Sequence, residues 1–337
     1  MKPGSRSDMS DRAIGGDPAG GSSQAGSAGQ PGRPGRAGRA LITGLQGFTG
    51  RYLAAELIAA GYEVYGVVHM HDSAPVPGVV ADHACDLRDP AGLARLVDTI
   101  QPDVVAHLAA IAFVGHGDVD AMYGTNLIGT RNLLEALSKA ARPLRAVLLA
   151  SSANVYGNAT EGTLTETAPA APANDYAVSK LAMEYMARLY ADKLPITVVR
   201  PFNYTGVGQS PQFLLPKIVG HVRDRAPVIE LGNLDVARDF TDVRTVVRYY
   251  RALLETPSAL GETFNVCSGE AYTLDAILTM AREISGHDFA VRVNPAFVRQ
   301  NEIKKLIGSC ARLKATVGAL PVIPLADTLR WMLDAPA

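Results

Sequence analysis

Short apolar runs alternate with longer segments whose apolar residues recur at helical spacing, from residue 39 onward. The apolar runs predict strands at residues 40–43, 63–68, 104–108, 146–149 and 196–199, and the longer segments predict helices at 52–60, 91–100, 126–140 and 176–190. Strands that are apolar along their whole length and separated by helices indicate a parallel sheet covered on both faces. The pattern therefore predicts an α/β fold of the Rossmann type, with a doubly wound parallel sheet.

The regular alternation ends near Pro201. Beyond it, proline, glycine and asparagine interrupt shorter elements, as expected of a smaller C-terminal α/β domain that binds substrate. We expect residues 39–204 and 240–267 to form the dinucleotide-binding domain, and residues 205–239 and 268–337 to form the smaller domain. A ligand should lie between the two.

The first 38 residues differ in composition, because Gly, Ser, Ala, Pro and Arg predominate and large apolar side chains are almost absent. Such a segment buries too little apolar surface to offset the entropy of ordering, so we expect a disordered tail. Its arginines Arg33 and Arg36, with Arg39, could contact phosphates, but arginines in such a background more often belong to a solvated tail.

The composition of the whole chain excludes several classes of partner. Its 337 residues are 47% hydrophobic and 19% charged, with a net charge of −1, so no general field attracts nucleic acid or an anionic membrane. We find neither the apolar region of a secretory signal nor about 18 consecutive apolar residues for a membrane span, and expect a cytoplasmic protein. The 3 cysteines and 7 histidines are dispersed without ligand spacing, so no metal site is predicted.

A glycine-rich segment follows the first predicted strand and opens the first predicted helix. Gly44, Gly47 and Gly50 have the spacing of a dinucleotide-binding turn, in which glycine permits a tight bend and lets the backbone approach a pyrophosphate. The N–H groups at the start of the helix, around Phe48 and Thr49, would then face the phosphates. A plain loop is the less favoured interpretation.

The end of the second strand bears on the choice of cofactor, because a carboxylate there binds the ribose 2′-hydroxyl of NAD and repels the 2′-phosphate of NADP. The strand ends at Val68-His69 without a carboxylate, and Asp72 follows only later, so NADP(H) is slightly favoured and NAD(H) remains open. His69 is equally compatible with an exposed loop residue. Asp86 and Leu87 follow a further strand expected between the strands at 63–68 and 104–108, and they are candidate adenine contacts, although an aspartate in a loop is commonly a helix cap.

Tyr176 and Lys180 are separated by close to one helical turn, so their phenol and ammonium lie on one face of a helix. An ammonium beside a phenol favours the phenolate, and we expect it to lower the pKa of Tyr176 from about 10 toward physiological pH. Such a tyrosine can exchange a proton with a substrate. An isolated pair would more often be two surface residues, but this one follows the glycine turn and the pair Ser151-Ser152.

The chain resembles the extended short-chain dehydrogenase/reductase family over essentially everything after residue 38. The motifs that carry the resemblance are the glycine turn, His107-Leu108-Ala109-Ala110, the set Ser151-Ser152, Tyr176 and Lys180, and Arg200-Pro201-Phe202-Asn203. The resemblance implies that Ser152 binds the reacting oxygen, that Tyr176 transfers the proton, and that Lys180 holds the nicotinamide ribose. It also implies cofactor contacts at Leu108, Ala109, Ala110 and Asn126. Without these motifs, two serines would equally cap a strand end.

A narrower resemblance, to GDP-6-deoxy-4-keto-mannose reductases, comes from the second half of the chain. It is carried by residues 200–206, 231–235, 238–243, 265–269 and 306–309. It implies that Asn203, Arg238 and Arg299 hold the nucleotide pyrophosphate, to which two arginines can offer planar bidentate donors. The substrate contacts implied are Ser151, Ser152, Asn203, Arg238, Arg299 and Glu302.

Two points about these substrate residues remain open. Arg238 could instead form a salt bridge with Asp239 or Asp242. The segment from Arg299 to Glu302 lacks the proline and serine of the usual Arg-Pro-Ser-Glu motif, which leaves the identity of the sugar undecided.

The residues after the serine pair bear on the type of reaction. Related 4,6-dehydratases place carboxylates there, because elimination of water requires an additional acid and base, whereas this chain has Ala153 and Asn154. We therefore expect NAD(P)H-dependent reduction of the 4-keto group of a GDP-linked 4-keto-6-deoxy sugar, a hexose such as 4-keto-6-deoxymannose or a 6-deoxy-heptose, in capsule or lipopolysaccharide biosynthesis. The alternatives are a nucleotide-sugar 4-epimerase that retains NAD and a non-catalytic protein that senses NADP(H).

The helix predicted at residues 176–190 is apolar on more than one side. One stripe consists of Val178, Leu181, Tyr185 and Leu189, and a second consists of Met183, Met186 and Tyr190. One stripe can pack on the sheet, and the other requires a partner. We expect a homodimer that joins this helix and the helix at 126–140 in an intermolecular four-helix bundle, as in the family. The alternative is that the C-terminal domain covers the second stripe.

Overall fold

The computed structural model describes residues 37–336, except 70–73, 113–117, 158–161 and 299–303. The described residues belong to one compact unit. Almost all of the predicted tail, and the predicted substrate residues Arg299 and Glu302, therefore lie outside the described residues. Gly38, the last residue assigned to the tail, begins the first strand.

The elements follow one another largely as the pattern predicts. The strands are β1 (Gly38–Thr43), β2 (Tyr62–Val68), β3 (Ala81–Ala84), β4 (Val104–His107), β5 (Ala146–Ala150), β6 (Thr163–Leu164), β7 (Ile196–Pro201), β8 (Asn203–Thr205), β9 (Val228–Leu231), β10 (Ala237–Asp242), β11 (Thr263–Val266), β12 (Ala271–Thr273), β13 (Ala290–Val293) and β14 (Lys305–Gly308). The helices are α1 (Phe48–Ala59), α2 (Pro90–Ile100), α3 (Val119–Tyr123), α4 (Thr130–Ser138), α5 (Asp175–Arg188), α6 (Leu214–Arg223), α7 (Val243–Glu255), α8 (Leu274–Ser285), α9 (Ala311–Val317) and α10 (Leu325–Asp334).

Seven of the described strands form a parallel sheet in the order β11-β7-β5-β4-β1-β2-β3. The chain builds β2 and β3 on one side of β1 and then places β4 on the other side. The strand order therefore reverses between β1 and β4, which confirms the predicted doubly wound sheet. Sheets of this kind bind ligands at the carboxyl ends of the strands beside such a reversal.

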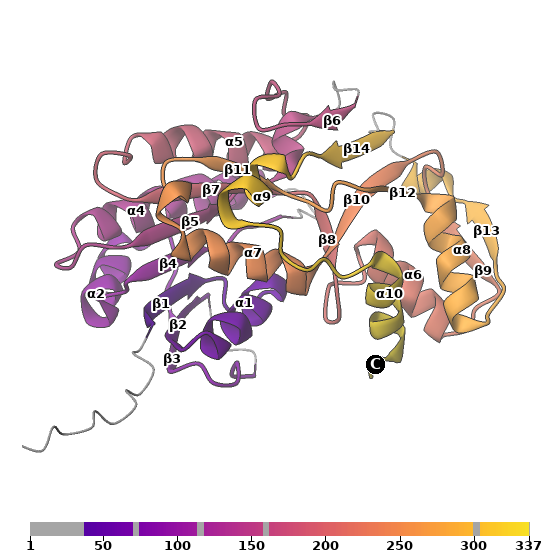
Figure 1. Cartoon of the computed structure of the whole chain (residues 1–337), viewed down its shortest axis with the longest axis horizontal. Helices are drawn as coiled ribbons and strands as arrows, with labels where there is room; N and C mark the ends of the chain where they lie inside the picture. The colour runs from indigo at the N-terminus through magenta and orange to yellow at the C-terminus, as the bar shows by residue number, and fades with distance from the viewer. Residues whose placement is uncertain (1–36, 70–73, 113–117, 158–161, 299–303, 337) are drawn as a thin grey trace, which may run out of the picture. The chain divides into compact units, whose positions relative to one another are not determined.

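Successive side chains of the central strands enter two different cores. Ala40 and Ile42 pack with α1 and α7, whereas Leu41, between them in sequence, packs with α2, α4 and α5 on the other face. Figure 1 shows α1 and α7 side by side over the sheet, where they contact each other. Because both faces are covered, the central strands are largely apolar, which is why the sequence indicated a parallel sheet.

A second sheet has the order β12-β10-β14-β6, with β8 beside β10. Only Phe202 separates β7 from β8, so the chain passes directly from the first sheet to the second. The pair β9 and β13 packs with α6, α8 and α10 to form a further core (Figure 1). A smaller α/β arrangement is thus present beyond Pro201. The expected domain boundaries remain a prediction. Strand β10 spans the boundary expected between residues 239 and 240.

The helix predicted at residues 126–140 begins earlier and contains a π-helical turn, Gly124–Gly129, between α3 and α4. Asn126 lies in this turn, where its side-chain nitrogen donates to the carbonyl of Ile111 at 3.0 Å and its side-chain oxygen accepts from the N–H of Ile111 at 2.8 Å. The same nitrogen donates to Ser179 Oγ at 3.0 Å. Asn126, predicted to contact the cofactor, therefore joins α5 to the loop after β4. Turns of this kind often occur at functional sites.

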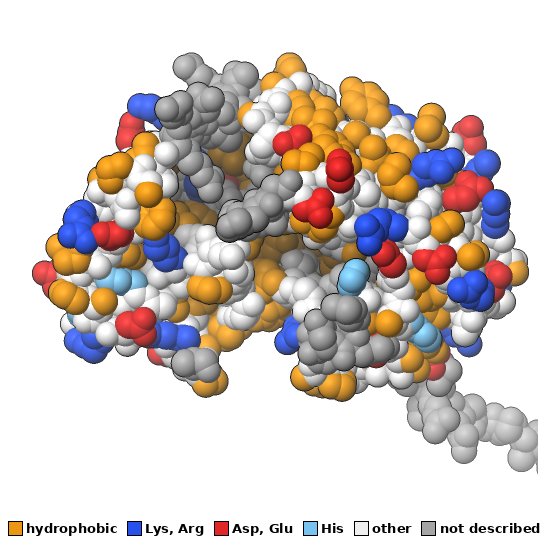
Figure 2. All heavy atoms as spheres, turned by 180° about the vertical axis from the view of Figure 1, so that it is seen from behind, with side chains coloured by type: hydrophobic (Ala, Val, Ile, Leu, Met, Phe, Trp, Pro, Cys, Tyr) orange, Lys and Arg blue, Asp and Glu red, His pale blue; other side chains and the backbone are white. Residues whose placement is uncertain are grey.

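The surface agrees with the nearly neutral composition. In Figure 2, side chains of both charges are interspersed over the visible face, which is hollowed near its middle. None of the helices in the described part of the chain is long and apolar enough to cross a membrane.

Candidate active site

The glycine turn connects β1 to α1 at the point where the strand order reverses. Gly44 has a φ of +73°, and a Cβ added to it would lie 2.9 Å from the backbone of Ala109. A Cβ added to Gly50 would lie 2.2 Å from the carbonyl oxygen of Gly44. Both positions therefore require glycine. The close approach brings the turn against Leu108, Ala109 and Ala110, which directly follow β4.

Helix α1 begins at the glycine turn without a side-chain cap from the described residues, because its N-cap residue is Gly47. The first two side chains of the helix contact Tyr204 in β8: the Phe48 ring stacks on it at a centroid distance of 6.0 Å, and Thr49 Oγ1 lies 2.8 Å from its hydroxyl. Because no described side chain caps the helix, the backbone N–H groups of its first turn can bind an anion. The side-chain nitrogen of Gln46 is also buried without a described partner. These features fit a dinucleotide pyrophosphate.

His69 is exposed at the end of β2, close to a charged pair after β3. Arg88 donates from Nη2 to Asp86 Oδ2 at 2.8 Å and from its backbone N–H to Oδ1 at 2.8 Å. Hydrogen bonds from Arg88 hold the pKa of Asp86 below its ordinary value, and His69 adds to this effect. Leu87, between the two charged residues, is buried. Arg88 is a cation at this end of the sheet that the sequence analysis did not single out.

Ser152, Tyr176 and Lys180 meet where β5 ends. Tyr176 lies in the first turn of α5, which begins there because the side chain of Asn174 caps a backbone N–H of that turn. The hydroxyl of Ser152 lies near the phenol of Tyr176 and favours its ionised form. Lys180 Nζ donates to the carbonyl of Ala150 at 2.7 Å and lies 6.0 Å from the centroid of the Tyr176 ring. The structure thus brings together the three residues predicted to be catalytic.

Burial controls the proton affinities of this group. It raises the pKa of Tyr176 to about 12, with Tyr204 adding to the rise and the Ser152 hydroxyl opposing it. It lowers the pKa of Lys180 to about 8, and Glu184 opposes that change. The prediction that Lys180 lowers the pKa of Tyr176 is therefore wrong in this structure, because desolvation raises that pKa and Lys180 is not among the groups that shift it.

Ser151 and Ser152 have different surroundings. Ser151 is buried, and its Oγ donates to Glu184 Oε1 at 2.5 Å. Ser152 Oγ accepts from the N–H of Asn154 at 3.1 Å and so caps the 3₁₀ turn Ala153–Tyr156. The capping role left open by the sequence is therefore filled by Ser152. Ser151, which was expected to bind substrate, is instead hydrogen-bonded within the core.

His107, at the end of β4, links the glycine turn to α4. Its Nδ1 lies 2.6 Å from Thr43 Oγ1, and its Nε2 lies 2.8 Å from Thr130 Oγ1. Thr130 already donates its hydroxyl proton to the carbonyl of Asn126, and Thr43 Oγ1 accepts from the N–H of Ala109 at 3.2 Å. His107 therefore donates through Nε2 and accepts at Nδ1. Burial lowers its pKa to about 3, which keeps the ring neutral.

Asn203 and Arg238, two of the predicted substrate residues, belong to the second sheet. Asn203 begins β8, and its side-chain nitrogen is buried without a hydrogen-bond partner among the described residues. Arg238 lies in β10 and donates from Nη1 to the carbonyls of Ala237 at 3.0 Å and Lys304 at 3.4 Å. The Asn203 nitrogen is therefore a donor that a ligand could use.

The two aspartates that were open as partners of Arg238 have other roles. Asp239 accepts the N–H groups of Ser268 at 2.8 Å and of Gly269 at 2.9 Å, and so holds the loop after β11. Asp242 pairs with Arg244, whose Nη2 donates to its Oδ2 at 2.7 Å. The salt bridge considered for Arg238 is therefore not formed with either of them.

Tyr250 is buried and Tyr204 is half-buried close to Tyr176, and the sequence analysis assigned neither a role. Burial raises the pKa of Tyr250 well above its ordinary value, and Tyr204 and Tyr176 add to the rise. Burial likewise raises the pKa of Tyr204. Tyr204 could have been found from its position directly after Asn203 in the Arg-Pro-Phe-Asn run, whereas Tyr250 has no such signal in the sequence.

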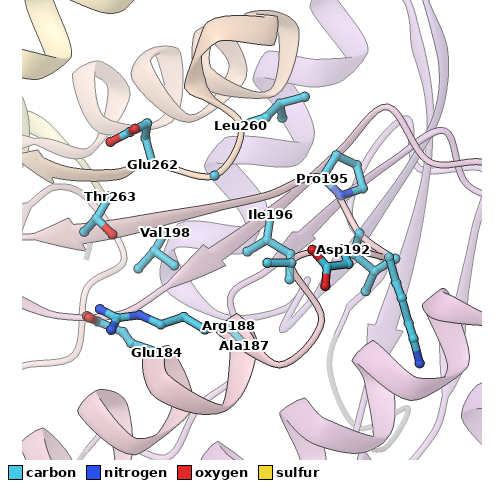
Figure 3. A pocket seen from close by; sticks show the side chains of 14 residues that line it. Glu184, Ala187, Arg188, Asp192, Pro195, Ile196, Val198, Leu260, Glu262 and Thr263 are labelled. Atoms are coloured by element: carbon cyan, nitrogen blue, oxygen red, sulfur yellow. The ribbon is translucent and has the colours of Figure 1, made fainter.

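A cavity of about 490 Å³ lies between α5, β7 and β11 (Figure 3). Glu184, Arg188, Ile196 and Glu262 are among the residues around it. None of the residues predicted for cofactor, substrate or catalysis lines this cavity, so it does not mark the active site. Among the described residues, no three His, Cys, Asp or Glu side chains gather as metal ligands would.

A Rossmann-type sheet with this serine, tyrosine and lysine beside its reversal point defines an extended short-chain dehydrogenase/reductase, as the sequence resemblance implied. Within that class, the chain belongs to the family described as GDP-mannose 4,6 dehydratase, whose model matches residues 41–332.

Two curated relatives have names that refer to GDP-linked 6-deoxy sugars. The GDP-6-deoxy-D-mannose reductase of Pseudomonas aeruginosa is 35% identical over 304 residues, which are 87% of this chain and 95% of the relative. The GDP-6-deoxy-D-talose 4-dehydrogenase of Aggregatibacter actinomycetemcomitans is 34% identical over 285 residues, which are 82% of this chain and 90% of the relative. The narrower resemblance stated from the sequence is therefore confirmed.

Solved structures give the same assignment of fold. A crystal structure from Burkholderia cenocepacia, of a protein whose provisional name is epimerase, is 54% identical, with a TM-score of 0.84 over 90% of this chain and 98% of that one. The structure of RMD from Pseudomonas aeruginosa complexed with NADPH is 32% identical, with a TM-score of 0.76 over 88% of this chain and 97% of that one.

Proposed function

We propose that this protein reduces the 4-keto group of a GDP-linked 4-keto-6-deoxy sugar with NAD(P)H. The observation that carries the proposal is the placement of Ser152, Tyr176 and Lys180 together where β5 ends, next to a glycine turn that fits a dinucleotide. The names of the two curated relatives support a GDP-linked 6-deoxy sugar as the substrate. The family is named after a dehydration, but Ala153 and Asn154 lack the carboxylates that elimination of water requires.

The three residues have separate tasks in this reaction. Tyr176 donates its phenolic proton to the oxygen on C4 of the sugar, and Ser152 donates a hydrogen bond to the same oxygen as negative charge develops there. Lys180, held by its bond to the carbonyl of Ala150, binds the ribose of the cofactor. A bound reduced nicotinamide supplies the hydride. The pKa of Tyr176, raised to about 12, supports this assignment because the phenol then remains a proton donor at neutral pH.

The nucleotide part of the substrate is assigned to the second sheet. We propose that Asn203 and Arg238 bind the diphosphate together with Arg299, and that Glu302, also from the segment before β14, contacts another part of the substrate. The buried, unpartnered nitrogen of Asn203 supports this role, because a buried donor without a partner is costly unless a ligand accepts from it. A guanidinium supplies the paired donors that a diphosphate requires.

NADPH is the proposed cofactor. Strand β2 ends at Val68 and His69 without a carboxylate that would repel a 2′-phosphate, and Arg88 adds a cation nearby. The neighbour structure from Pseudomonas aeruginosa contains NADPH, which also supports this choice. Asp86 is neutralised by its pair with Arg88, so it opposes the phosphate less than an isolated carboxylate would.

The proposal is tested by Tyr176→Phe, which removes one hydroxyl from the site. With GDP-4-keto-6-deoxymannose and NADPH, we expect kcat to fall by about 10²–10⁴-fold, since general acid catalysis contributes roughly that factor. NADPH binding, measured by fluorescence, should remain. The matched control is Tyr185→Phe on the exposed side of the same helix, for which we expect wild-type turnover. Undiminished turnover by Tyr176→Phe would exclude the proposed role.

A 4-epimerase that retains NAD is the second candidate, because the Burkholderia cenocepacia relative has epimerase as its provisional name. The same three side chains would serve both reactions. A protein that only senses NADP(H) is disfavoured, since such proteins commonly lose the tyrosine or the lysine and this chain keeps Tyr176 and Lys180.

A second copy of this chain is the proposed partner of α5. Val178, Tyr185 and Leu189 lie exposed along this helix, and Ile128, in the π-helical turn, is also exposed. The residues of the other apolar stripe, Met183, Met186 and Tyr190, pack into the core beside the sheet. One apolar stripe of α5 thus packs inside the protein, and residues of the other stripe are exposed. The exposed residues support the expected homodimer, because a second copy could cover them.

A further inference from the structure

A chain of buried polar side chains runs behind the candidate active site. At its centre are Glu184 on α5 and Arg200 on β7, with exposed fractions of 3% and 7%. Arg200 donates from Nε to Glu184 Oε1 at 2.9 Å and from Nη2 to Oε2 at 2.6 Å. This bidentate pair fixes the orientation of both side chains.

The pair reaches the site through Ser151. Ser151 Oγ donates to Glu184 Oε1 at 2.5 Å, and the N–H of Ser151 donates to the carbonyl of Val199 at 2.8 Å. The backbone at Ser152 is extended, with φ −158° and ψ 148°, so the side chains of Ser151 and Ser152 point to opposite sides. Holding Ser151 from behind therefore fixes the direction in which Ser152 presents its hydroxyl to Tyr176.

Glu184 also acts on Lys180, which lies one helical turn before it on α5. Burial disfavours the ammonium of Lys180, and the Glu184 carboxylate favours it. Among the described residues, Tyr176 on α5 and the neutral ring of His107 on β4 also lie near this lysine, and Glu184 itself is paired with Arg200 on β7. Glu184 thus supplies the carboxylate whose charge favours the ammonium form of Lys180.

We propose that Glu184 and Arg200 are positioning residues of the reduction, in that the pair fixes Ser152 through Ser151 and maintains Lys180 as an ammonium. The inference rests on the proposed function, in which Ser152 and Lys180 supply the reacting groups. Both members of the pair are buried, so they act through these neighbours and not on the substrate itself.

If Glu184 and Arg200 had only a structural role, changing the residues that bond Arg200 on the side away from Ser151 should have the same effect as changing Glu184. There, Arg200 Nη1 donates to the hydroxyl of Tyr156 at 3.0 Å, and this hydroxyl donates to Asn265 Oδ1 at 2.7 Å. Tyr156 is completely buried, and its hydroxyl bonds these two residues and not Ser151 or Lys180. Tyr156→Phe is therefore a matched control, because it removes a buried hydroxyl from Arg200 and leaves Glu184 in place.

The experiment compares Glu184→Gln and Tyr156→Phe with the wild-type protein. Turnover of GDP-4-keto-6-deoxymannose with NADPH and the affinity for NADPH, measured by fluorescence, are followed as functions of pH. We expect kcat of Glu184→Gln to fall by about 100-fold at nearly unchanged KM for the sugar, as for a small misplacement of a reacting group. The alkaline limits of turnover and of NADPH binding should also move to lower pH, because Lys180 without a facing carboxylate loses its proton more readily.

Two further variants keep the test decisive. Glu184→Asp retains the charge and should return the alkaline limit toward its wild-type position. If Glu184→Gln does not fold, as judged by circular dichroism, Ser151→Ala removes the connection to Ser152 and should itself lower kcat by about tenfold or more.

The possible results distinguish a failure of the positioning role from a failure of the proposed function. A pH profile of Glu184→Gln that matches the profiles of wild type and Tyr156→Phe overturns the positioning role. A wild-type protein that reduces no GDP-linked ketosugar overturns the proposed function alone, and the pH dependence of NADPH affinity in Glu184→Gln then decides the role of Glu184.

Discussion

At the scale of single residues, the proton on Tyr176 is governed by its surroundings more than by its lysine neighbour. The phenol is buried, and its pKa is raised to about 12. Lys180 directs its ammonium to the carbonyl of Ala150, and its own pKa is lowered to about 8. A protonated phenol beside a cation suits a reduction, in which the developing alkoxide must receive a proton.

Gly50 allows a prediction about the glycine turn. A Cβ at this position would meet the carbonyl oxygens of Gly44 at 2.2 Å and Leu45 at 2.6 Å, so Gly50→Ala must displace the backbone. We expect the free energy of unfolding to fall by about 1–3 kcal/mol and the affinity for NADPH to fall by about tenfold or more. Urea denaturation and fluorescence titration measure the two effects.

The matched control is Gly220→Ala in α6, where an added Cβ meets nothing within 4 Å. Alanine is the better helix former by roughly 0.5–1 kcal/mol, so this variant should gain slightly in stability and bind NADPH as the wild type does. Equal NADPH affinities for the two variants would count against the role of the turn.

His107 allows a prediction about pH. Its pKa is lowered from 6.5 to about 3 in the folded protein, so only the unfolded chain binds a proton at this residue between those values. The free energy of unfolding should therefore fall as the pH drops below about 6.5, by up to about 1.4 kcal/mol per pH unit from this residue. The variant His107→Gln cannot titrate there. We expect it to be less stable near pH 7 and to lose less stability on acidification.

Urea denaturation at pH values from about 7 down to about 5 measures this difference, because the contributions of other titrating groups are shared by both proteins. Parallel pH dependences for wild type and His107→Gln would contradict the assignment of a buried neutral ring.

At the scale of elements, the sequence predicts the strands and helices of the first sheet well. The central strands are buried on two faces, so their side chains are largely apolar, as in Ala146–Ala150. The π-helical turn Gly124–Gly129 was not predicted, since it depends on the bonds of Asn126 to Ile111, which comes from another part of the fold. Short strands such as β8 were also not predicted, because three residues are too few to show a periodic pattern.

Helix α5 carries the prediction about assembly. Tyr185 and Leu189 are 58% and 79% exposed on the stripe proposed for the partner. Two carboxylates placed there by Tyr185→Glu and Leu189→Glu should prevent a second copy from packing, so the double variant is expected to be a monomer. Sedimentation velocity at micromolar concentration measures the state.

Val80→Glu serves as the control for this prediction, because Val80 is 54% exposed on the loop before β3 and away from α5 in the sequence. It should sediment as the wild type does. A wild-type protein that is already monomeric refutes the proposed dimer.

At the scale of the whole molecule, the sequence predicts the catalytic set better than the substrate contacts. Tyr176 and Lys180 share one helix, so their relation follows from spacing alone. Glu184 could have been found in the same way, since it lies one turn beyond Lys180. Its partner Arg200 comes from a different strand, however, and only the folded chain shows that the two residues meet.

The presence or absence of bound dinucleotide in the purified protein distinguishes the two candidate reactions, reduction and epimerisation. A reductase must exchange its dinucleotide in each turnover, whereas an epimerase recovers its hydride and can retain NAD. We therefore expect the purified protein to lack the absorbance of a bound dinucleotide and to oxidise added NADPH in proportion to the ketosugar supplied. Protein that carries tightly bound NAD and interconverts two GDP-sugars without added cofactor would favour the epimerase.

The direct passage from β7 to β8 at Phe202 has an evolutionary consequence. Ser152, Tyr176, Lys180 and the buried pair behind them belong to the first sheet and its helices, whereas Asn203 and Arg238 stand on the second. Mutations that reshape sugar preference can accumulate on one side of this junction while the chemistry is inherited intact on the other. Grafting the segments that carry β8 to β10 and β12 to β14 from relatives with other sugars, while keeping α7 and β11, is thus a rational route to reductases of altered selectivity.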